Sequence, residues 1–312
     1  MIIKSADDKS RRLNFLESLR LSSKIGVSQK NWLADEIDRT RKGIAGERDA
    51  AHYLDSYFRD SQNHMVLHDL RLHVDGETAQ IDHLIINRVL DFFLLETKNF
   101  GGSVSITDHG EFSVRYPGGR EIGIPSPIEQ SRRHANVLRK VLKALSIGGR
   151  FGVEPNFEHV VLVHPKASIK RPYVTKFDSS NVIKADQFET WRDKHIDSTG
   201  VAATFGMLAN VRSPETIRDA AERLARQHRP EDPLRLPAFM ALAAPVVQPA
   251  GAPASSPIKV VQAAQPSEVE NAKRLICMSC NNKISFAEGK FCWGNQKRFG
   301  GKQYCREHQA AF

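Results

Sequence analysis

Two carboxylates and a lysine interrupt apolar runs that have the length of β-strands. Glu96 and Lys98 directly follow the run 92–95, and Asp82 stands inside the run 81–86. Because side chains alternate along a strand, Glu96 and Lys98 project from the same face of it. Burying unpaired charge is costly, so these groups must form ion pairs, bind a metal or lie at an exposed rim.

The two carboxylates would meet if their strands pair as a hairpin. Directly opposite residues of an antiparallel pair point to one face, so Asp82 lies opposite Glu96 if a three-residue loop, 88–90, joins the strands. Two adjacent carboxylates repel unless a hard divalent cation binds both through oxygen. This spacing predicts a site for Mg²⁺, or Mn²⁺, at Asp82 and Glu96. His83 would face the other way and is left out of the site.

Two more polar side chains interrupt apolar stripes of expected helices. Glu47 lies in the stripe of a helix at about residues 42–59, and Gln130 lies in the stripe of a helix at about 127–145. Either residue alone could be a hydrogen-bonded buried group. Four such insertions, in the order Glu, Asp, Glu-x-Lys and Gln, favour one shared site.

The surrounding elements are a mixture of helices and strands. Besides the two helices, strands are expected at about 65–72, 79–87, 92–100 and 158–164. A loop rich in Gly and Pro precedes the second helix, and residues 193–229, including Leu208, keep a helical pattern. The order predicts an α/β fold with a mixed sheet flanked by helices.

Four segments together resemble a known family. They are Gly43–Glu47, Gln80–Ile86, Glu96–Gly102 and Pro125–Gln130, and they resemble the NERD (nuclease-related) domain over roughly residues 41–163. That family is assigned to the PD-(D/E)xK nuclease superfamily. The resemblance implies a PD-(D/E)xK nuclease-like mixed sheet and a divalent metal, with Glu47, Asp82, Glu96, Lys98 and Gln130 as the catalytic set.

Phosphodiester hydrolysis suits these residue types. A metal held by carboxylates activates water and stabilises charge on the phosphate. Lys98 would position that water, and Gln130 would orient water or backbone. Arg132 and Arg133, on the same helix as Gln130, would contact flanking phosphates.

The C-terminal residues predict a zinc module. Cys277 and Cys280 form one pair, and Cys305 and His308 form a second pair, with 24 residues between Cys280 and Cys305. Structural zinc takes four tetrahedral N or S ligands, so these four residues are the expected set, with Cys292 as the alternative to His308. Lys297 and Arg298 lie among aromatic residues, a composition that suits nucleic-acid contact, although those aromatics could instead form the module's own core.

The domain organisation follows from composition. Eight prolines occur from Pro230 to Pro266, which indicates an extended, disordered linker. We therefore expect a partly helical, loosely attached segment without chemistry at 1–40, the nuclease-like domain at 41–229, the linker at 230–270 and the zinc-binding module at 271–312.

Charge and cysteine usage narrow the function further. A net charge of +9 favours a polyanionic partner such as nucleic acid. No apolar run reaches the length of a membrane span, and clustered cysteines suit metal binding in a reducing compartment, so a cytoplasmic location is expected. The sequence predicts a metal-dependent endonuclease acting on DNA. A non-catalytic nucleic-acid-binding protein and an adaptor acting through its zinc module are the alternatives.

Overall fold

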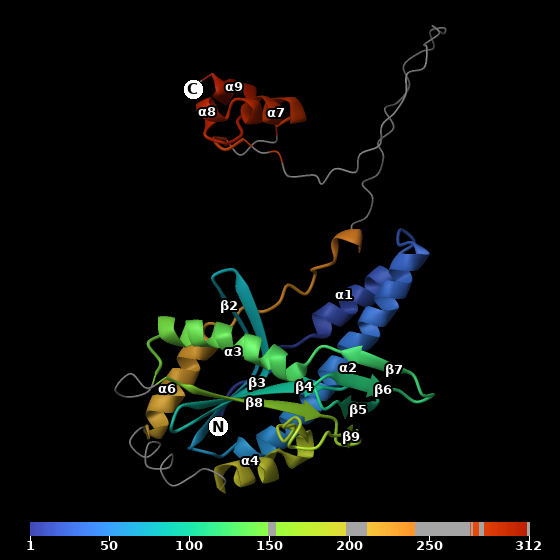
Figure 1. Ribbon diagram of the computed structural model, residues 1–312, viewed down its shortest axis with the longest axis vertical. Coiled ribbons are helices and arrows are strands. Elements are labelled where there is room, and N and C mark those ends of the chain that lie inside the picture. The colour runs from blue at the N-terminus through green and yellow to red at the C-terminus, as the bar shows by residue number, and fades with distance from the viewer. Residues whose placement is uncertain (149–153, 198–210, 241–274, 276, 281–283, 311–312) are drawn as a thin grey trace. The chain divides into compact units, whose positions relative to one another are not determined.

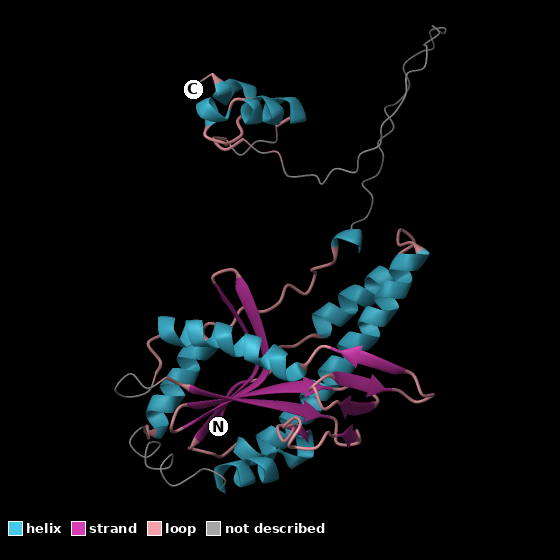
Figure 2. Cartoon of the chain, in the orientation of Figure 1, coloured by secondary structure: helices cyan, strands magenta, loops and turns pink. Residues whose placement is uncertain are grey.

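The chain divides into two compact units, Met1–Val246 and Val247–Phe312. The computed structural model describes residues 1–148, 154–197, 211–240, 275, 277–280 and 284–310. The first unit is a mixed α/β fold in which helices flank two mixed sheets (Figure 1, Figure 2). This is the fold class that the sequence predicts.

The main sheet contains all four strands expected from the sequence. Its order is β1 (Ile2–Lys4), β2 (His64–Val74), β3 (Glu77–Asn87), β4 (Asp91–Lys98), β8 (Asn156–Val163) and β10 (Val182–Lys184). The strands β2, β3 and β4 pair antiparallel, whereas β4, β8 and β10 run parallel. The antiparallel hairpins carry the polar residues, and the parallel strands supply a buried apolar centre.

The β3–β4 hairpin has the three-residue loop that the site requires. Arg88, Val89 and Leu90 connect Asn87 to Asp91, and Leu90 takes a left-handed conformation with φ 62°. Three-residue hairpin loops commonly combine a type I turn with one left-handed residue. The observed pairs, from Ile86 with Phe92 to His83 with Leu95, confirm the predicted register.

Helices cover both faces of the main sheet. On one face α3 (Pro127–Ala144) and α6 (Pro214–Ala225) pack on side chains such as Leu84 and Leu94. On the other, α2 (Val27–Phe58), α4 (Phe188–Asp197) and the short helix η2 (Ala185–Gln187) pack on side chains such as Ile85 and Leu95. The alternation of adjacent residues between these two cores is the strand periodicity read from the sequence.

The sequence suggested a loop for the glycine- and proline-rich segment before α3, but this segment forms three strands, β5 (Ser103–Ile106), β6 (Phe112–Arg115) and β7 (Glu121–Ile124). With β9 (Ile169–Lys170), which follows α3 in the chain, they make a second sheet in the order β7, β6, β5, β9. Three of these strands have four residues each and β9 has two, too short for a clear alternation pattern. The sheet is stabilised by packing Val104, Ile106 and Phe112 against the end of β8.

The N-terminal segment is not loosely attached. Strand β1 pairs with β2, and α1 (Ser10–Leu21) packs against the first part of α2, which begins at Val27 instead of about residue 42. A small apolar cluster that includes Leu16, Leu33 and Ile37, all nearly inaccessible to solvent, holds the two helices together. Because this helix pair buries few apolar residues, its sequence looks polar and weakly patterned.

The expected linker begins with a packed stretch. Residues 230–240 include the short helix η3 (Ala238–Met240), and Met240 is only 2% exposed within the α1–α2 cluster. Arg12 donates to the carbonyl oxygens of Pro233 and Arg235, at 3.1 and 2.5 Å. Residues 230–240 are therefore packed on the first unit and are not a mobile linker. Residues 241–274 lie outside the described part of the chain. In the expected helical region 193–229, α4 ends at Asp197 and α6 begins at Pro214. Leu208, which belongs to that expected pattern, also lies outside the described residues.

The second unit is small. It contains α7 (Phe286–Gly294), α8 (Gln296–Phe299) and α9 (Arg306–Gln309). Its buried side chains are Cys277, Ile284, Cys292, Phe299 and Tyr304. So little apolar surface favours stabilisation by a bound metal.

The packing of Met240 leads to a stability prediction. Met240→Ala should loosen the α1–α2 pair by about 2 kcal/mol, the lower end of the usual cost of truncating a buried methionine. Hydrogen exchange should therefore accelerate in α1 and the first half of α2. Leu234→Ala is the control, because Leu234 is 45% exposed and its truncation should leave exchange unchanged. Equal exchange in both variants would mean that 230–240 does not hold these helices.

Candidate active site and candidate zinc centre

Asp82 and Glu96 stand side by side on the α3 face of the main sheet. The pairing of His83 with Leu95, continued by one residue, places Asp82 opposite Glu96. The backbone N–H of Thr97 donates to Asp82 Oδ2 at 2.7 Å. The two carboxylates therefore lie on the same face of the sheet, and their binding of a shared metal and their catalytic role stay predictions.

Burial and mutual repulsion make these carboxylates hold protons tightly. Burial raises the pKa of Asp82 well above its ordinary value, and the charges of Glu96 and Glu47 raise it further. Burial also raises the pKa of Glu96, against the opposing effect of the Lys98 ammonium. A divalent cation would replace those protons, since it removes the same repulsion.

Lys98 links the strand site to helix α3. Its Nζ donates to Glu96 Oε1 at 2.7 Å and to Gln130 Oε1 at 3.1 Å. Gln130 is aimed there by the start of α3, where Pro127 occupies the first turn and Ser126 accepts the N–H of Glu129. An ammonium has three donors, so one N–H of Lys98 remains for a water or a phosphate oxygen.

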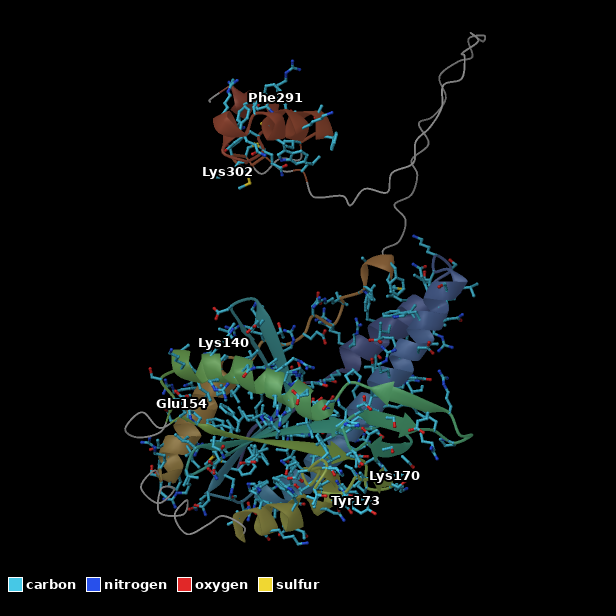
Figure 3. The ribbon with its side chains drawn as sticks, in the orientation of Figure 1. Lys140, Glu154, Lys170, Tyr173, Phe291 and Lys302 are labelled. Atoms are coloured by element: carbon cyan, nitrogen blue, oxygen red, sulfur yellow. The ribbon has the colours of Figure 1, made fainter. Side chains whose placement is uncertain are left out.

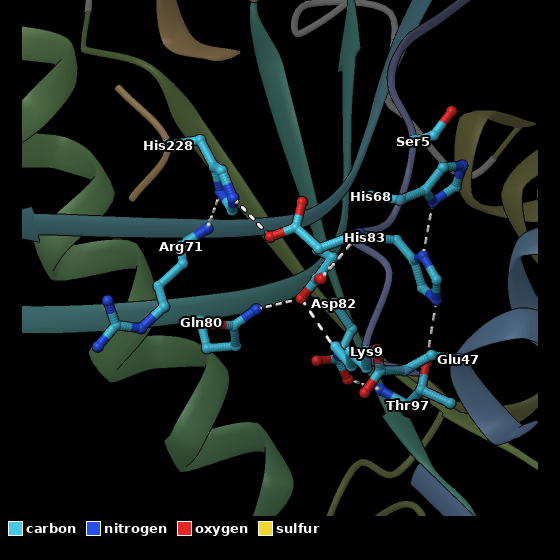
Figure 4. Close-up of polar contacts among 12 residues, drawn as sticks. Ser5, Lys9, Glu47, His68, Arg71, Gln80, Asp82, His83, Thr97 and His228 are labelled. Carbon is cyan, nitrogen blue, oxygen red and sulfur yellow. Dashed lines mark hydrogen bonds and ion pairs between the residues drawn. The ribbon is translucent and has the colours of Figure 1, made fainter. Parts of the chain in front are cut away.

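Glu47 reaches the site from α2 and is held by a residue that sequence reasoning missed. Lys9 Nζ lies 2.7 Å from Glu47 Oε2 and 3.3 Å from Asp69 Oδ1 (Figure 4). Asp69 is 3% exposed, has φ 54° and also accepts the N–H of Asp7. Sequence analysis expected no chemistry in residues 1–40, and the structure places Lys9 of that segment against Glu47, whose catalytic role stays a prediction. No local pattern marks Lys9, because its partners are far away in the sequence.

A neutral imidazole completes the polar surroundings of Glu96. His134 Nδ1 is buried without a hydrogen-bond partner among the described residues, and it lies 3.7 Å from Glu96 Oε2. Burial lowers the pKa of His134 to about 4, so the imidazole ring is uncharged near neutral pH. His134 shares the α3 stripe with Gln130, the pattern that could have revealed it.

The donor set fits a hard cation held by two carboxylates. Asp82 and Glu96 lie opposite each other on adjacent strands, and the buried Nδ1 of His134 lies beside Glu96. Within the described residues, Glu47, Asp82 and Glu96 do not gather their ligand atoms within 4.8 Å of one another. A cation at the pair would keep several waters, as Mg²⁺ usually does.

His83 belongs to a hydrogen-bond chain on the opposite face, as its position next to Asp82 predicts. His68 Nε2 lies 3.0 Å from Asp55 Oδ1. His68 Nδ1 lies 2.7 Å from His83 Nδ1, and His83 Nε2 lies 3.1 Å from the Thr97 hydroxyl (Figure 4). Burial lowers the pKa of His83 well below its ordinary value. The neutral histidines fix Thr97, whose N–H binds Asp82.

The two arginines expected to bind phosphates lie on the exposed side of α3. Arg132 forms an ion pair with Glu129 at 2.5 Å, whereas Arg133 has no ion-pair partner among the described residues. Of the two, Arg133 is the one whose charge is available. Their contact with nucleic acid stays a prediction.

In the second unit, Cys277, Cys280, Cys305 and His308 converge. Their ligand atoms all lie within 4.8 Å of one another. The Cys280 and Cys305 sulfurs are 3.9 Å apart, and Cys277 Sγ is 3.8 Å from His308 Nδ1. A tetrahedron with Zn–S bonds of about 2.3 Å has edges of roughly 3.8 Å, so this cluster could hold zinc. Although burial alone would raise it, hydrogen bonds from backbone N–H groups lower the pKa of Cys277 to about 6, which favours a thiolate ligand.

Cys292 is placed apart from the four clustered ligands. Its buried sulfur accepts the N–H of Tyr304 at 3.3 Å and the amide of Gln309 at 3.3 Å. It is therefore a packed thiol of the core, and the structure favours His308 over the alternative ligand.

The aromatic residues of the second unit divide into two groups. Phe299 is 2% exposed and belongs to the core, whereas Phe286, Phe291 and Trp293 are at least 38% exposed. Phe291 and Lys302 project from the unit (Figure 3). Arg298 donates to Gln309 O at 3.2 Å, and the side chain of Lys297 lies outside what the structure describes. Phe299 therefore forms part of the unit's own core, and the three exposed aromatic side chains do not.

Comparison with known proteins gives one family-model match, to a part of the chain. Residues 42–164 match the model of the family described as nuclease-related domain, NERD. The chain therefore contains a nuclease-related domain, which includes all five residues of the expected catalytic set and excludes Lys9 and the Cys/His cluster. No curated protein and no solved structure matches the chain significantly. None of the helices in the described residues is both long and apolar enough to cross a membrane.

The ion pair of Lys9 leads to a prediction about metal affinity. Lys9→Met should strengthen Mn²⁺ binding roughly tenfold, because it removes a positive charge beside the carboxylates that contributes on the order of 1 kcal/mol. Titration calorimetry on zinc-loaded protein measures it. Lys24→Met, at the exposed α1–α2 turn, is the matched control and should bind as wild type does. Weaker binding without Lys9 would show that Lys9 supports the site instead of competing there.

Substitution of a predicted zinc ligand, Cys280, and of the core thiol, Cys292, tests the zinc cluster. Cys280→Ser should abolish zinc binding and unfold residues 275–310, because the unit lacks a sufficient core. Cys292→Ser should retain one equivalent of zinc. Elemental analysis of protein purified without chelator gives the stoichiometry. Zinc lost from Cys292→Ser but kept by Cys280→Ser would reverse the assignment.

Proposed function

We propose that this protein is a metal-dependent endonuclease that hydrolyses phosphodiester bonds of DNA. The observation that carries the proposal is the pairing of Asp82 with Glu96 in a nuclease-related domain, with Lys98 bound to Glu96. A pure binding protein gains nothing from adjacent carboxylates, because they repel phosphate. The net charge of +9 is compatible with a polyanionic substrate.

The residues of the site divide the chemical tasks. A divalent cation, when bound by Asp82 and Glu96, would act as a Lewis acid and lower the pKa of a water. Lys98 uses two donors to hold Glu96 and Gln130 and directs the third toward the attacking water or a phosphate oxygen. Glu47 adds negative charge from α2, and the Gln130 amide can donate to the same water.

The zinc-binding unit would assist this reaction by binding nucleic acid. Its exposed Phe286, Phe291 and Trp293 offer faces for base stacking, and Lys302 of the same unit is also exposed. A second nucleic-acid-binding site on the same chain raises the effective concentration of the substrate at the nuclease site. A cytoplasmic location belongs to this proposal, since thiolate ligands stay reduced there.

Substitution of Glu96 separates catalysis from binding. Glu96→Gln keeps the shape of the side chain and removes a charge, so cleavage with Mg²⁺ or Mn²⁺ should fall by about a hundredfold or more. Affinity for DNA should hold or rise, because one repulsive charge is lost. Initial rates on plasmid and single-stranded DNA, with anisotropy for binding, measure both effects.

The matched control is Glu129→Gln, which removes an exposed carboxylate from α3 and should not alter cleavage. Equal cleavage by wild type and Glu96→Gln would assign the activity to another site or to a contaminant. If neither protein cuts any substrate but both bind DNA, the chain is a non-catalytic nucleic-acid-binding protein. If neither cuts nor binds, the adaptor alternative takes its place.

A further inference from the structure

A cleft begins beside Lys98 and follows the second sheet. It has a volume of about 540 Å³ and lies between the ends of β4 and β8 and the strands β5 and β6. We call it the Tyr116 cleft; the side chains used below are Lys98, Phe100, Arg115, Tyr116, His164 and Lys166. Nothing in the catalytic set beyond Lys98 belongs to it.

The wall of this cleft is fixed by a close backbone contact. A Cβ at Gly102 would lie 2.6 Å from the carbonyl oxygen of Arg115 and 2.9 Å from Val114 Cγ1. Gly101, just before it, has φ 65°. The turn after β4 therefore presses directly on β6 and positions Arg115 and Tyr116 relative to Lys98.

The cleft has the charge that a phosphate chain requires. Among the residues that line it, Lys98, Arg115 and Lys166 are cationic and none is Asp or Glu. The hollow at Lys9 and Glu47 is net acidic, because its lining has seven Asp and Glu residues and four Lys and Arg residues. A polyanion is therefore attracted more strongly to the first hollow than to the second.

Donors on these cations remain available. Lys166 is exposed and has no ion-pair partner among the described residues. Arg115 is bound by Glu121 through Nε and Nη2, at 3.3 and 2.9 Å, which holds the guanidinium in place. Its Nη1 has no hydrogen-bond partner in the described part of the chain, so it can donate to a phosphate oxygen.

The aromatic side chains indicate which form of nucleic acid fits. Tyr116 is half-buried and stacks on no other ring among the described residues, and Phe100 is half-buried in the same lining. Only an unpaired base can offer its face to such a ring. The volume is that of a small-molecule pocket, which admits a single strand and excludes a duplex.

We propose that the Tyr116 cleft binds an unpaired stretch of nucleic-acid strand adjoining the phosphate at Asp82 and Glu96. The proposal rests on the proposed nuclease function for its substrate, and it adds the strand path and a preference for unpaired flanks. Tyr116 would stack on a base, and Arg115 and Lys166 would contact the phosphates on either side.

Two measurements on the full chain test this site. Tyr116→Ala should raise KM for a single-stranded oligonucleotide about tenfold with kcat nearly unchanged, whereas Tyr116→Phe should behave as wild type, because it keeps the ring. Lys166→Ala should weaken binding and reduce the salt slope by about 0.7, the value for one single-strand phosphate contact. Tyr173→Ala, at an exposed tyrosine (Figure 3), and Lys24→Ala are the matched controls.

Photo-crosslinking locates the strand directly. A short oligonucleotide carrying 5-iodouracil is irradiated with the Glu96→Gln variant, which should bind without cutting, and the crosslinked peptide is identified by mass spectrometry. We expect it to contain Tyr116 or Phe100, with single-stranded DNA competing for the site and a mononucleotide or a fully paired duplex competing poorly.

The outcomes distinguish this proposal from the proposed function. If Tyr116→Ala cuts with unchanged KM, or crosslinks map only to other peptides, the cleft proposal is wrong while a loss of cleavage in Glu96→Gln would still support the nuclease. If wild type never cuts but the crosslink forms at Tyr116, the cleft is a binding site without catalysis. Equal competition by a mononucleotide would show that the cleft binds a nucleotide and not a strand. The absence of any crosslink would overturn the cleft proposal.

Discussion

The repulsion between Asp82 and Glu96 is the constraint on which the rest of the site depends. Both carboxylates are forced onto one face of adjacent strands, where burial disfavours their charge. Glu96 is compensated by Lys98, and Glu47 is compensated by Lys9. In the described part of the chain, Asp82 accepts the N–H of Thr97 and forms no ion pair. A bound cation would therefore supply Asp82 with the positive charge that Lys98 and Lys9 supply to the two glutamates.

The two hollows beside the site differ in the charge of their linings. The lining at Lys9 is net acidic, and the lining at Lys98 has cations and no Asp or Glu. In the proposed cleft, an anionic strand would therefore approach along the Lys98 side. The second sheet packs on the end of β8 and supplies Arg115 and the neighbouring wall of that cleft.

Short-range periodicity explains which features could be predicted from the sequence. The strands of the main sheet show clear alternation, and a loop of three residues determines that Asp82 faces Glu96 and His83 faces away. The zinc cluster follows from the spacing of its two ligand pairs. In each case the chemistry depends on residues whose relation is set within one element or one turn.

Features that depend on long-range packing were not predictable in this way. Strands of four residues in the second sheet carry too few side chains to show a period. Met240 docks on helices more than two hundred residues earlier, among prolines that indicate a linker. Lys9 meets Glu47 only because α1 and α2 pack together, and Asp69 helps because its backbone is left-handed.

The loop at 88–90 has a consequence for how such a protein can evolve. A substitution at its third position must keep a side chain that adopts the left-handed conformation and also packs in the core, where Leu90 is 4% exposed. One residue inserted into β3 between His83 and Asn87 is different in kind, because with the same loop it would shift the register of the residues before it by one and exchange their faces. His83 would then lie opposite Glu96, and Asp82 would face the histidine chain. The number of residues between Asp82 and the loop therefore decides between a carboxylate pair and a mixed histidine–carboxylate site.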